Sequence, residues 1–243
     1  MRKFLYQNVG IMLVFALFSG VQGCGSADKS KAEQENVSQK KEATYTLSEQ
    51  SHAEFSLPQP QKTGGMPLME ALLNRKTTRV FVDKMLSDQQ ISDLLWASNG
   101  VNREDGKRTA PSASNCQEID IYLFTKNAIY FYDAPTNTLK RIKEGDFVRQ
   151  AGNNDFFANA PIALAFVGNY DKMARYADRP EAQEFYSATD VGFVSQNLYL
   201  YCASEGLATV VCGNIERDVI QSLLGVANGK VLLTQPVGYT EDN

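Results

Sequence analysis

The sequence of 243 residues predicts an α+β domain in which a central mixed or antiparallel sheet is flanked by helices. Three patterns support this prediction. Apolar residues alternate with others at 119–123, a nearly continuous apolar run covers 161–168, and the stretch 190–208 is apolar on most sides. The first two patterns are typical of strands. The third indicates a helix buried in a core or in a subunit interface.

The first 23 residues have the pattern of a signal peptide. The letters MRKF precede the apolar run Val9–Phe18, which is too short for a bilayer span of roughly 20 residues. Gly23 before Cys24 resembles the cleavage site of bacterial lipoproteins, although Gln22 is not the small residue usual there. That resemblance implies lipidation of Cys24 and a place in the cell envelope, on the extracytoplasmic, periplasmic side. A plain secretory signal or an uncleaved anchor are the alternatives.

Residues 24–62 are expected to form a flexible tether between the lipid anchor and the folded domain. This stretch is charged, polar and poor in large apolar groups, so it cannot offset the entropy of ordering. It contains the single histidine, His52, which is expected to be solvated rather than to bind a ligand. The folded domain is therefore expected to occupy residues 63–243.

Two helices are expected at the start of this domain. Pro67 suits a helix start and precedes the letters LMEALLNR. Ser87 and Gln90 fit a capping box that begins a second helix, and Gly100 can close it. The second helix carries an apolar stripe at spacings i, i+3 and i+4, formed by Ile91, Leu94 and Leu95.

The remaining elements follow in order. Residues 128–133 are expected to pair with the strand at 119–123 as a hairpin, with its turn near Lys126 and Asn127. After the buried strand at 161–168 and the long helix, the letters ATVVCG predict a short strand. A helix ending at Gly225 and a last strand with the letters KVLLTQPVGY complete the domain.

Composition excludes several classes of function. The net charge of −4, without a basic cluster interleaved with aromatics, argues against nucleic acid as a partner. One histidine argues against histidine-based catalysis and against a metal site built from several histidines. Without CxxC pairs, the cysteines do not indicate zinc, and Cys202 and Cys212 are expected to be buried free thiols.

A candidate anion site follows the first helix. Arg75, Thr77 and Arg79 alternate, so an extended or turn-like backbone would place two guanidinium groups and a hydroxyl on one side, suited to a phosphate. The alternative is that these basic residues only complement the dipole of the preceding helix. Gly213, at the end of the short strand, could let the backbone approach a ligand closely, although glycine is common at strand ends.

Several segments in this order resemble the nitroreductase family of FMN enzymes, over about residues 66–240. The phrases LLWASNGVN and RTAPSAS look closest to the branch that contains the azoline dehydrogenases of thiazole/oxazole peptide biosynthesis. The residues that carry the family resemblance are Arg75, Thr77, Arg79, the loop Pro111-Ser112-Ala113-Ser114-Asn115, Gly192 to Leu198, Gly206-Leu207, and Pro236 to Tyr239.

The resemblance implies a role for each group. Arg75, Lys76, Thr77 and Arg79 match the positions that bind the phosphate and ribityl chain of FMN. Pro111, Ser112, Ala113 and Ser114 match the small loop beside the flavin, and Asn115 matches the amide at the polar edge of the ring. Cys212 and Gly213 match the backbone near the flavin N5. The helix around Gln196 and Asn197 matches the core of an intertwined homodimer that binds FMN at the subunit interface.

The chain departs from the family pattern at one point. Relatives often carry a late lysine or arginine for the phosphate, whereas Tyr239 is followed here by the letters TEDN. Arg108 is the expected replacement, and the alternative is a solvated loop arginine. Cys116, directly after Asn115, either packs or reacts.

The resemblance therefore implies an FMN-dependent oxidoreductase that transfers hydride or electrons through flavin N5 to or from a small organic substrate in the cell envelope. No side chain is expected to act as an acid or base catalyst, because the flavin carries the chemistry. The alternative is a non-catalytic envelope lipoprotein that uses the same fold to bind a ligand or partner. A peptide-modifying azoline oxidase is a further alternative, which the export signal opposes.

Overall fold

In the computed structural model, residue 47 and residues 53–241 are described. The predicted signal peptide, the lipidation site Cys24, His52 and most of the predicted tether lie outside these residues. Within the described ranges, no helix combines the length and apolar character that a membrane span requires.

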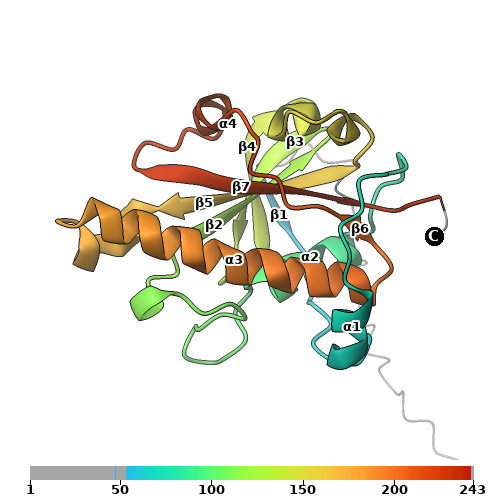
Figure 1. Ribbon diagram of the computed structural model, residues 1–243, viewed down its shortest axis with the longest axis horizontal. Coiled ribbons are helices and arrows are strands. Elements are labelled where there is room, and N and C mark those ends of the chain that lie inside the picture. Colours follow the sequence, from blue (N-terminus) through green and yellow to red (C-terminus); the bar gives the residue numbers. More distant parts are fainter. Residues whose placement is uncertain (1–46, 48–52, 242–243) are drawn as a thin grey trace, which may run out of the picture. The chain divides into compact units, whose positions relative to one another are not determined.

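A seven-stranded sheet forms the centre of the domain, with strand order β1-β4-β3-β2-β5-β7-β6 (Figure 1). Every pair of neighbouring strands is antiparallel, which confirms the predicted α+β class. The strands are β1 (Glu54–Ser56), β2 (Ile119–Thr125), β3 (Ala128–Asp133), β4 (Thr138–Glu144), β5 (Ile162–Asn169), β6 (Ala208–Thr209) and β7 (Gly229–Gly238).

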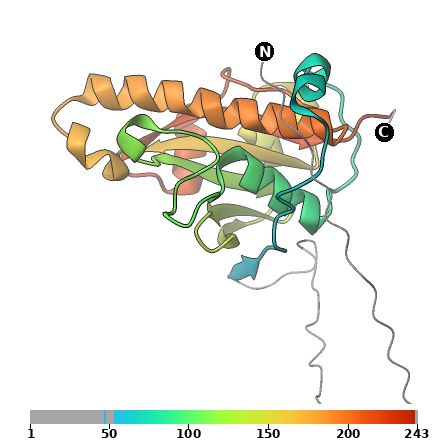
Figure 2. The ribbon, with the colours of Figure 1, turned by 90° about the horizontal axis from the view of Figure 1, so that it is seen from below.

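Helices cover both faces of the sheet. The α-helices are α1 (Leu68–Asn74), α2 (Asp88–Asn99), α3 (Pro180–Ser204) and α4 (Arg217–Leu224). Short 3-10 turns are η2 (Ala113–Asn115), η3 (Val148–Ala151), η4 (Asp155–Ala158) and η5 (Tyr170–Tyr176). Figures 1 and 2 show α2 and α3 on one face and α4 on the other. Each face has its own apolar cluster, one including Ile91, Leu123 and Leu198, the other including Phe124, Phe157 and Ile220.

Local sequence signals explain several of these elements. Ser87 caps α2 by accepting from the Gln90 backbone N–H, and the Gln90 side chain bonds back to Ser87, as the capping box predicts. The β2–β3 hairpin is also confirmed. Gly225 ends α4 in the left-handed conformation, with φ of 66°, which glycine adopts without a side-chain clash.

The domain starts earlier than the predicted boundary at residue 63. Strand β1 pairs with β4, and the side chains of Phe55 and Leu57 are buried in the core. The Leu47 backbone N–H donates to the Asp88 carboxylate, 3.2 Å away. The prediction of a tether through residue 62 is therefore wrong for the segment around β1, because two apolar residues are enough to fasten it to a sheet edge.

The long helix α3 also begins earlier than the stretch 190–208 indicated. It starts at Pro180, whose fixed φ suits a first helical position, and runs for 25 residues, or about 37 Å. Its polar first half has no apolar periodicity that would mark it as a helix. Because α3 lies along the whole sheet in Figure 1, residues near its two ends meet different parts of the chain.

Candidate functional site

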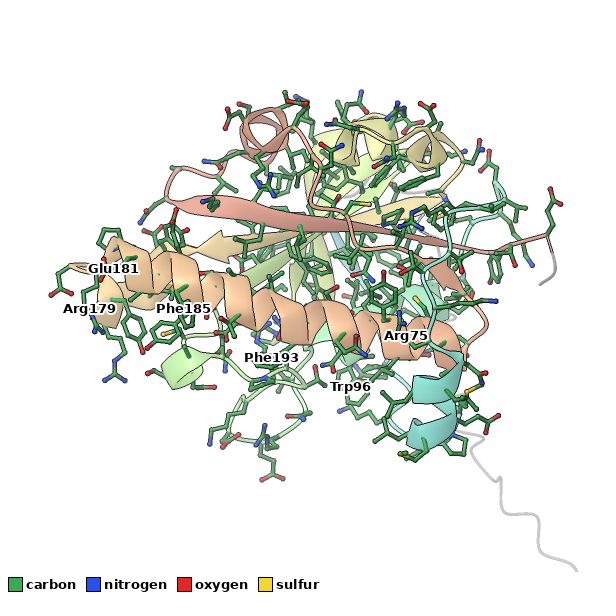
Figure 3. The ribbon with its side chains drawn as sticks, in the orientation of Figure 1. Arg75, Trp96, Arg179, Glu181, Phe185 and Phe193 are labelled. Carbon is green, nitrogen blue, oxygen red and sulfur yellow. The ribbon has the colours of Figure 1, made fainter. Side chains whose placement is uncertain are left out.

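The basic segment after α1 is fastened to α3 by one tyrosine. The backbone turns away from the helix at Arg75, and Thr78 N–H donates to the Thr209 carbonyl at 3.0 Å. The hydroxyls of Thr77 and Tyr199 share a hydrogen bond of 3.1 Å. The Arg75 guanidinium lies 5.3 Å from the centre of the Tyr199 ring, within the range of a cation–π contact. Thr77 and Arg75, the latter labelled in Figure 3, thus contact the same side chain and are two of the three residues that were predicted to share a side.

Tyr199 also holds the segment after β6. The Val211 N–H donates to the Tyr199 hydroxyl oxygen at 2.9 Å, which leaves the tyrosine proton for Thr77. The ring of Tyr199 is buried. One side chain therefore joins the 75–79 segment, α3 and the strand end near Cys212. Sequence reasoning missed Tyr199, because an aromatic residue in a buried helix is first expected to be core.

Cys212 lies where the resemblance places backbone beside a flavin. Its N–H and carbonyl exchange hydrogen bonds with Thr234 of β7, at 2.8 and 3.0 Å. Burial raises the pKa of its thiol to about 11, and the charge of Arg79 opposes this shift. The thiol is therefore protonated at neutral pH. Cys202 and Cys212 are buried and free, as predicted.

No packing within the chain requires glycine at position 213. A Cβ there would lie 3.6 Å from the Leu233 side chain, which is an ordinary contact. Gly213 is exposed, so its open side is available to a ligand. A separate cavity of about 550 Å³ is lined in part by Lys76, Thr78 and Tyr199, but not by Gly213.

The loop at 111–117 forms a second group of candidate residues. The Ala113 N–H donates to the buried Asp190 carboxylate of α3 at 2.7 Å, and the hydroxyls of Ser114 and Tyr176 share a hydrogen bond of 2.7 Å. The Ser112 hydroxyl accepts from the Gln117 N–H at 2.9 Å. These contacts hold the small side chains of the loop at the surface next to α3.

This loop has an unusual backbone. Ser114, Asn115 and Gln117 have φ of 52°, 55° and 52°, in the left-handed region that residues with side chains rarely adopt. Asparagine tolerates this region better than most residues. The Asn115 side chain is exposed, and its Oδ1 accepts from the Gln117 amide at 3.3 Å. Backbone strain of this kind concentrates at ligand-binding segments.

Arg108 does not lie with the first group in this chain. Its Nε donates to Gln117 Oε1 at 3.0 Å and its Nη1 to the Asn99 carbonyl at 3.1 Å. Burial lowers the pKa of its guanidinium, which the charge of Asp120 partly restores. Arg108 thus links the last residue of α2, Asn99, to Gln117 of the loop at 111–117. Arg108 is therefore not the solvated loop arginine of the alternative. Its role toward a flavin phosphate stays a prediction.

The two groups lie on opposite sides of α3. Ala113 contacts Asp190, whereas Thr77 contacts Tyr199, nine residues further along the helix. Nine residues advance an α-helix by about 13 Å and turn it by about two and a half turns, which places the two side chains on opposite faces. Figure 1 agrees, with the loop below the N-terminal half of α3 and the segment after α1 near its C-terminal end. One chain therefore presents two separate half-sites.

Comparisons with known proteins agree with this fold. The profile of the nitroreductase family matches residues 72–239. A protein of Methanocaldococcus jannaschii that carries a provisional nitroreductase name is 30% identical over 196 residues, covering 76% of this chain and 96% of that protein.

Solved structures give the same result. A provisionally named nitroreductase from Ralstonia eutropha JMP134 is 36% identical with a TM-score of 0.73, covering 79% of this chain and 91% of that one. The NADPH:FMN oxidoreductase of Vibrio harveyi, in complex with NAD+, is 22% identical with a TM-score of 0.53, covering 72% and 69% of the two chains. At that identity the second likeness concerns the fold alone.

Changing Tyr199 to Phe tests the fastening role of its hydroxyl. The ring stays, but Thr77 and the Val211 N–H lose their hydrogen-bond partner. We therefore expect the free energy of unfolding to fall by about 1–2 kcal/mol. Urea unfolding measures this change.

Tyr170→Phe is the matched control, because the buried Tyr170 hydroxyl has no hydrogen-bond partner among the described residues. Its removal should change stability by less than about 0.5 kcal/mol or increase it. Equal effects of the two changes would contradict the role given to Tyr199.

Proposed function

The chain belongs to the nitroreductase family, and from this we propose that it is an FMN-dependent oxidoreductase acting on a small organic substrate. Family membership supports a flavin oxidoreductase in general. The choice of FMN rests on the family resemblance and on the basic segment, because a flavin without phosphate would not need such a segment. The observation that carries the proposal is the fixed placement of Arg75 and Thr77 on Tyr199, with Lys76 and Arg79 in the same segment.

This segment has the charge that a flavin phosphate requires. Among the described residues, no ion pair engages Arg75, Lys76 or Arg79, although other lysines and arginines of the domain form them. Guanidinium groups bind phosphate oxygens through two parallel hydrogen bonds, which makes such contacts roughly twice as strong as neutral ones. Arg75, Lys76 and Arg79 give this short segment three positive charges.

The residues of the chain bind and position the cofactor. A bound FMN would supply two-electron transfer through its N5 atom, which protein side chains cannot perform. Arg75, Lys76, Thr77 and Arg79 would hold its phosphate and ribityl chain. The small residues Pro111 to Ser114 would leave room for the ring, and the Asn115 amide can donate and accept at its polar edge. The Cys212–Gly213 backbone would border the N5 side.

We also propose that the active form is a homodimer. Several large apolar side chains are exposed: Leu68, Met69 and Leu73 of α1, and Phe185 and Phe193 of α3, the last two labelled in Figure 3. Exposed apolar groups of this size mark contact surfaces. A second copy would also complete the site, since the half-sites of one chain lie on opposite faces of α3.

The likeness of two short phrases to azoline dehydrogenases supports a position near that branch. The export signal opposes a role in peptide modification, because such modification normally precedes export. The non-catalytic envelope lipoprotein is favoured only by the missing late cation and by the unusual Gln22.

Visible absorption of the purified full-length chain tests the cofactor. We expect a flavin spectrum, and we expect Arg75→Ala to raise the FMN dissociation constant about 10- to 100-fold, since it removes a charge-assisted pair of hydrogen bonds. Titration of the protein with FMN, followed by flavin fluorescence, measures this constant.

Arg141→Ala is the control, because Arg141 belongs to β4 near the opposite edge of the sheet and its variant should bind FMN as the natural chain does. A colourless protein that takes up no added FMN would favour the non-catalytic alternative.

For the location, we propose a lipoprotein held in the cell envelope through Cys24. Lipid chains anchor a soluble domain by burying their methylene groups in the bilayer. Replacing Cys24 by Ser should move the protein from the membrane fraction to the soluble fraction, and the mass of the N-terminal peptide of the natural chain should include the lipid. An unmodified N-terminal peptide that begins at Met1 would contradict the proposal.

A further inference from the structure

A fully buried acid lies directly behind the strained loop. Glu118 follows Gln117, and its side chain has 0% exposure. Neither carboxyl oxygen has a well-formed hydrogen bond to another described residue. An isolated ionised carboxylate in such a place is very costly, so a buried acid of this kind is stable only if it is protonated or paired with a cation.

The titratable and charged groups around Glu118 and the nearby Cys116 come from three elements. Asp190 of α3 is itself buried, and Lys172 and Arg175 belong to η5. Lys172 does not form an ion pair with Glu118, because its Nζ binds Asp120 Oδ1 at 2.5 Å. Cys116 of the loop is the remaining titratable neighbour, and Arg175 acts on its thiol. Glu118 therefore faces another acid without a cation of its own.

These surroundings make the acid hard to ionise. Burial and, to a smaller extent, the adjacent Asp190 carboxyl raise the pKa of Glu118 to about 7, although its own backbone N–H and the charge of Lys172 oppose the shift. The pKa of the Cys116 thiol is raised by burial and by Glu118, so that thiol is not the source of a compensating charge.

Resting on the proposed function, we propose that Glu118 and Asp190 share one proton and that this acid pair positions the loop 113–117 for the flavin. The protonated Glu118 donates to Asp190, and Asp190 Oδ2 keeps its hydrogen bond from the Ala113 N–H at 2.7 Å. When Glu118 loses its proton, two buried carboxylates repel each other. Asp190 then no longer holds Ala113, and the left-handed residues of the loop lose the contact that stabilises their backbone.

The pH dependence has a definite sign. The pKa of Glu118 is higher in the folded than in the unfolded chain, so its protonated form stabilises the fold fully at pH below about 4.3, the unfolded value. This stabilisation is lost as pH rises through about 7. If only the protonated form binds FMN well, the competent fraction falls about tenfold between pH 6 and pH 8, and the apparent dissociation constant rises by the same factor.

Replacing Glu118 by Gln in the full-length chain tests the proposal. Glutamine is neutral at every pH, and its amide can still donate to Asp190. We expect the FMN dissociation constant of the natural chain to rise about tenfold from pH 6 to pH 8, and that of Glu118→Gln to change less than about twofold.

Glu144→Gln is the matched control, because Glu144 lies exposed at the end of β4. The FMN dissociation constant of Glu144→Gln should still rise about tenfold from pH 6 to pH 8. A tenfold change that persists in Glu118→Gln would overturn the proposal.

Thermal unfolding without flavin separates this proposal from the function on which it rests. The melting temperature of the natural chain should fall from pH 6 to pH 8 more than that of Glu118→Gln. Should Glu118→Gln not fold, Asp190→Asn removes the like charge and should move the midpoint of the fall to lower pH. Absence of FMN binding at every pH, with these melting profiles intact, contradicts the cofactor but not the acid pair. Identical melting profiles in all variants contradict the acid pair, whether or not FMN binds.

Discussion

Helix α3 imposes the constraint on which the rest of the site depends. It packs on the core through Val191, Val194, Leu198 and Cys202, and helical geometry fixes the position of every side chain along its 25 residues. Tyr199 points to the basic segment after α1, and Asp190 points to the loop at 111–117. The two segments that the family resemblance links to one flavin are therefore attached to opposite faces of a rigid element, and no side-chain rearrangement within one chain can bring them together.

This geometry explains features that are otherwise unrelated. The apolar side chains on α1 and α3 remain exposed in a single chain, as expected for a surface that a second copy covers. In the proposed two-fold dimer, each basic segment would lie against the loop of the other chain and give two equivalent sites. The loop must then be held accurately on its own chain before a partner arrives. Its anchors are Asp190, Tyr176 and, through Gln117, Arg108.

Much of the fold could be predicted from the sequence, because strongly patterned segments have few alternatives. The capping box of α2, the β2–β3 hairpin and the end of α4 at Gly225 are all local signals, and the structure has each of them. Strand β1 and the first half of α3 could not be predicted, since their polar residues pair or pack only through contacts far along the chain.

For the site, too, local sequence patterns predicted only part of the arrangement. The alternation of Arg75, Thr77 and Arg79 predicted that the three would share a side, and two of them, Arg75 and Thr77, contact Tyr199. The position of Arg108 depends on which side of α3 its loop lies, which no local pattern contains. Glu118 was missed because a single acid before a strand gives no sign of its burial, and only the packed structure shows that it faces Asp190 rather than a cation.

The most direct test of a site shared between two chains combines two variants, each of which lacks one half-site. Arg75→Ala removes one half-site, and Asn115→Gly removes the other while keeping a residue that accepts the left-handed backbone. Each variant alone should bind FMN poorly. After the two are unfolded together and refolded, random pairing should restore about a quarter of the flavin sites, because half of the dimers are mixed and each has one intact site. Flavin binding that stays at the level of the separate variants would show that both half-sites of a functional centre come from the same chain, and would contradict the account.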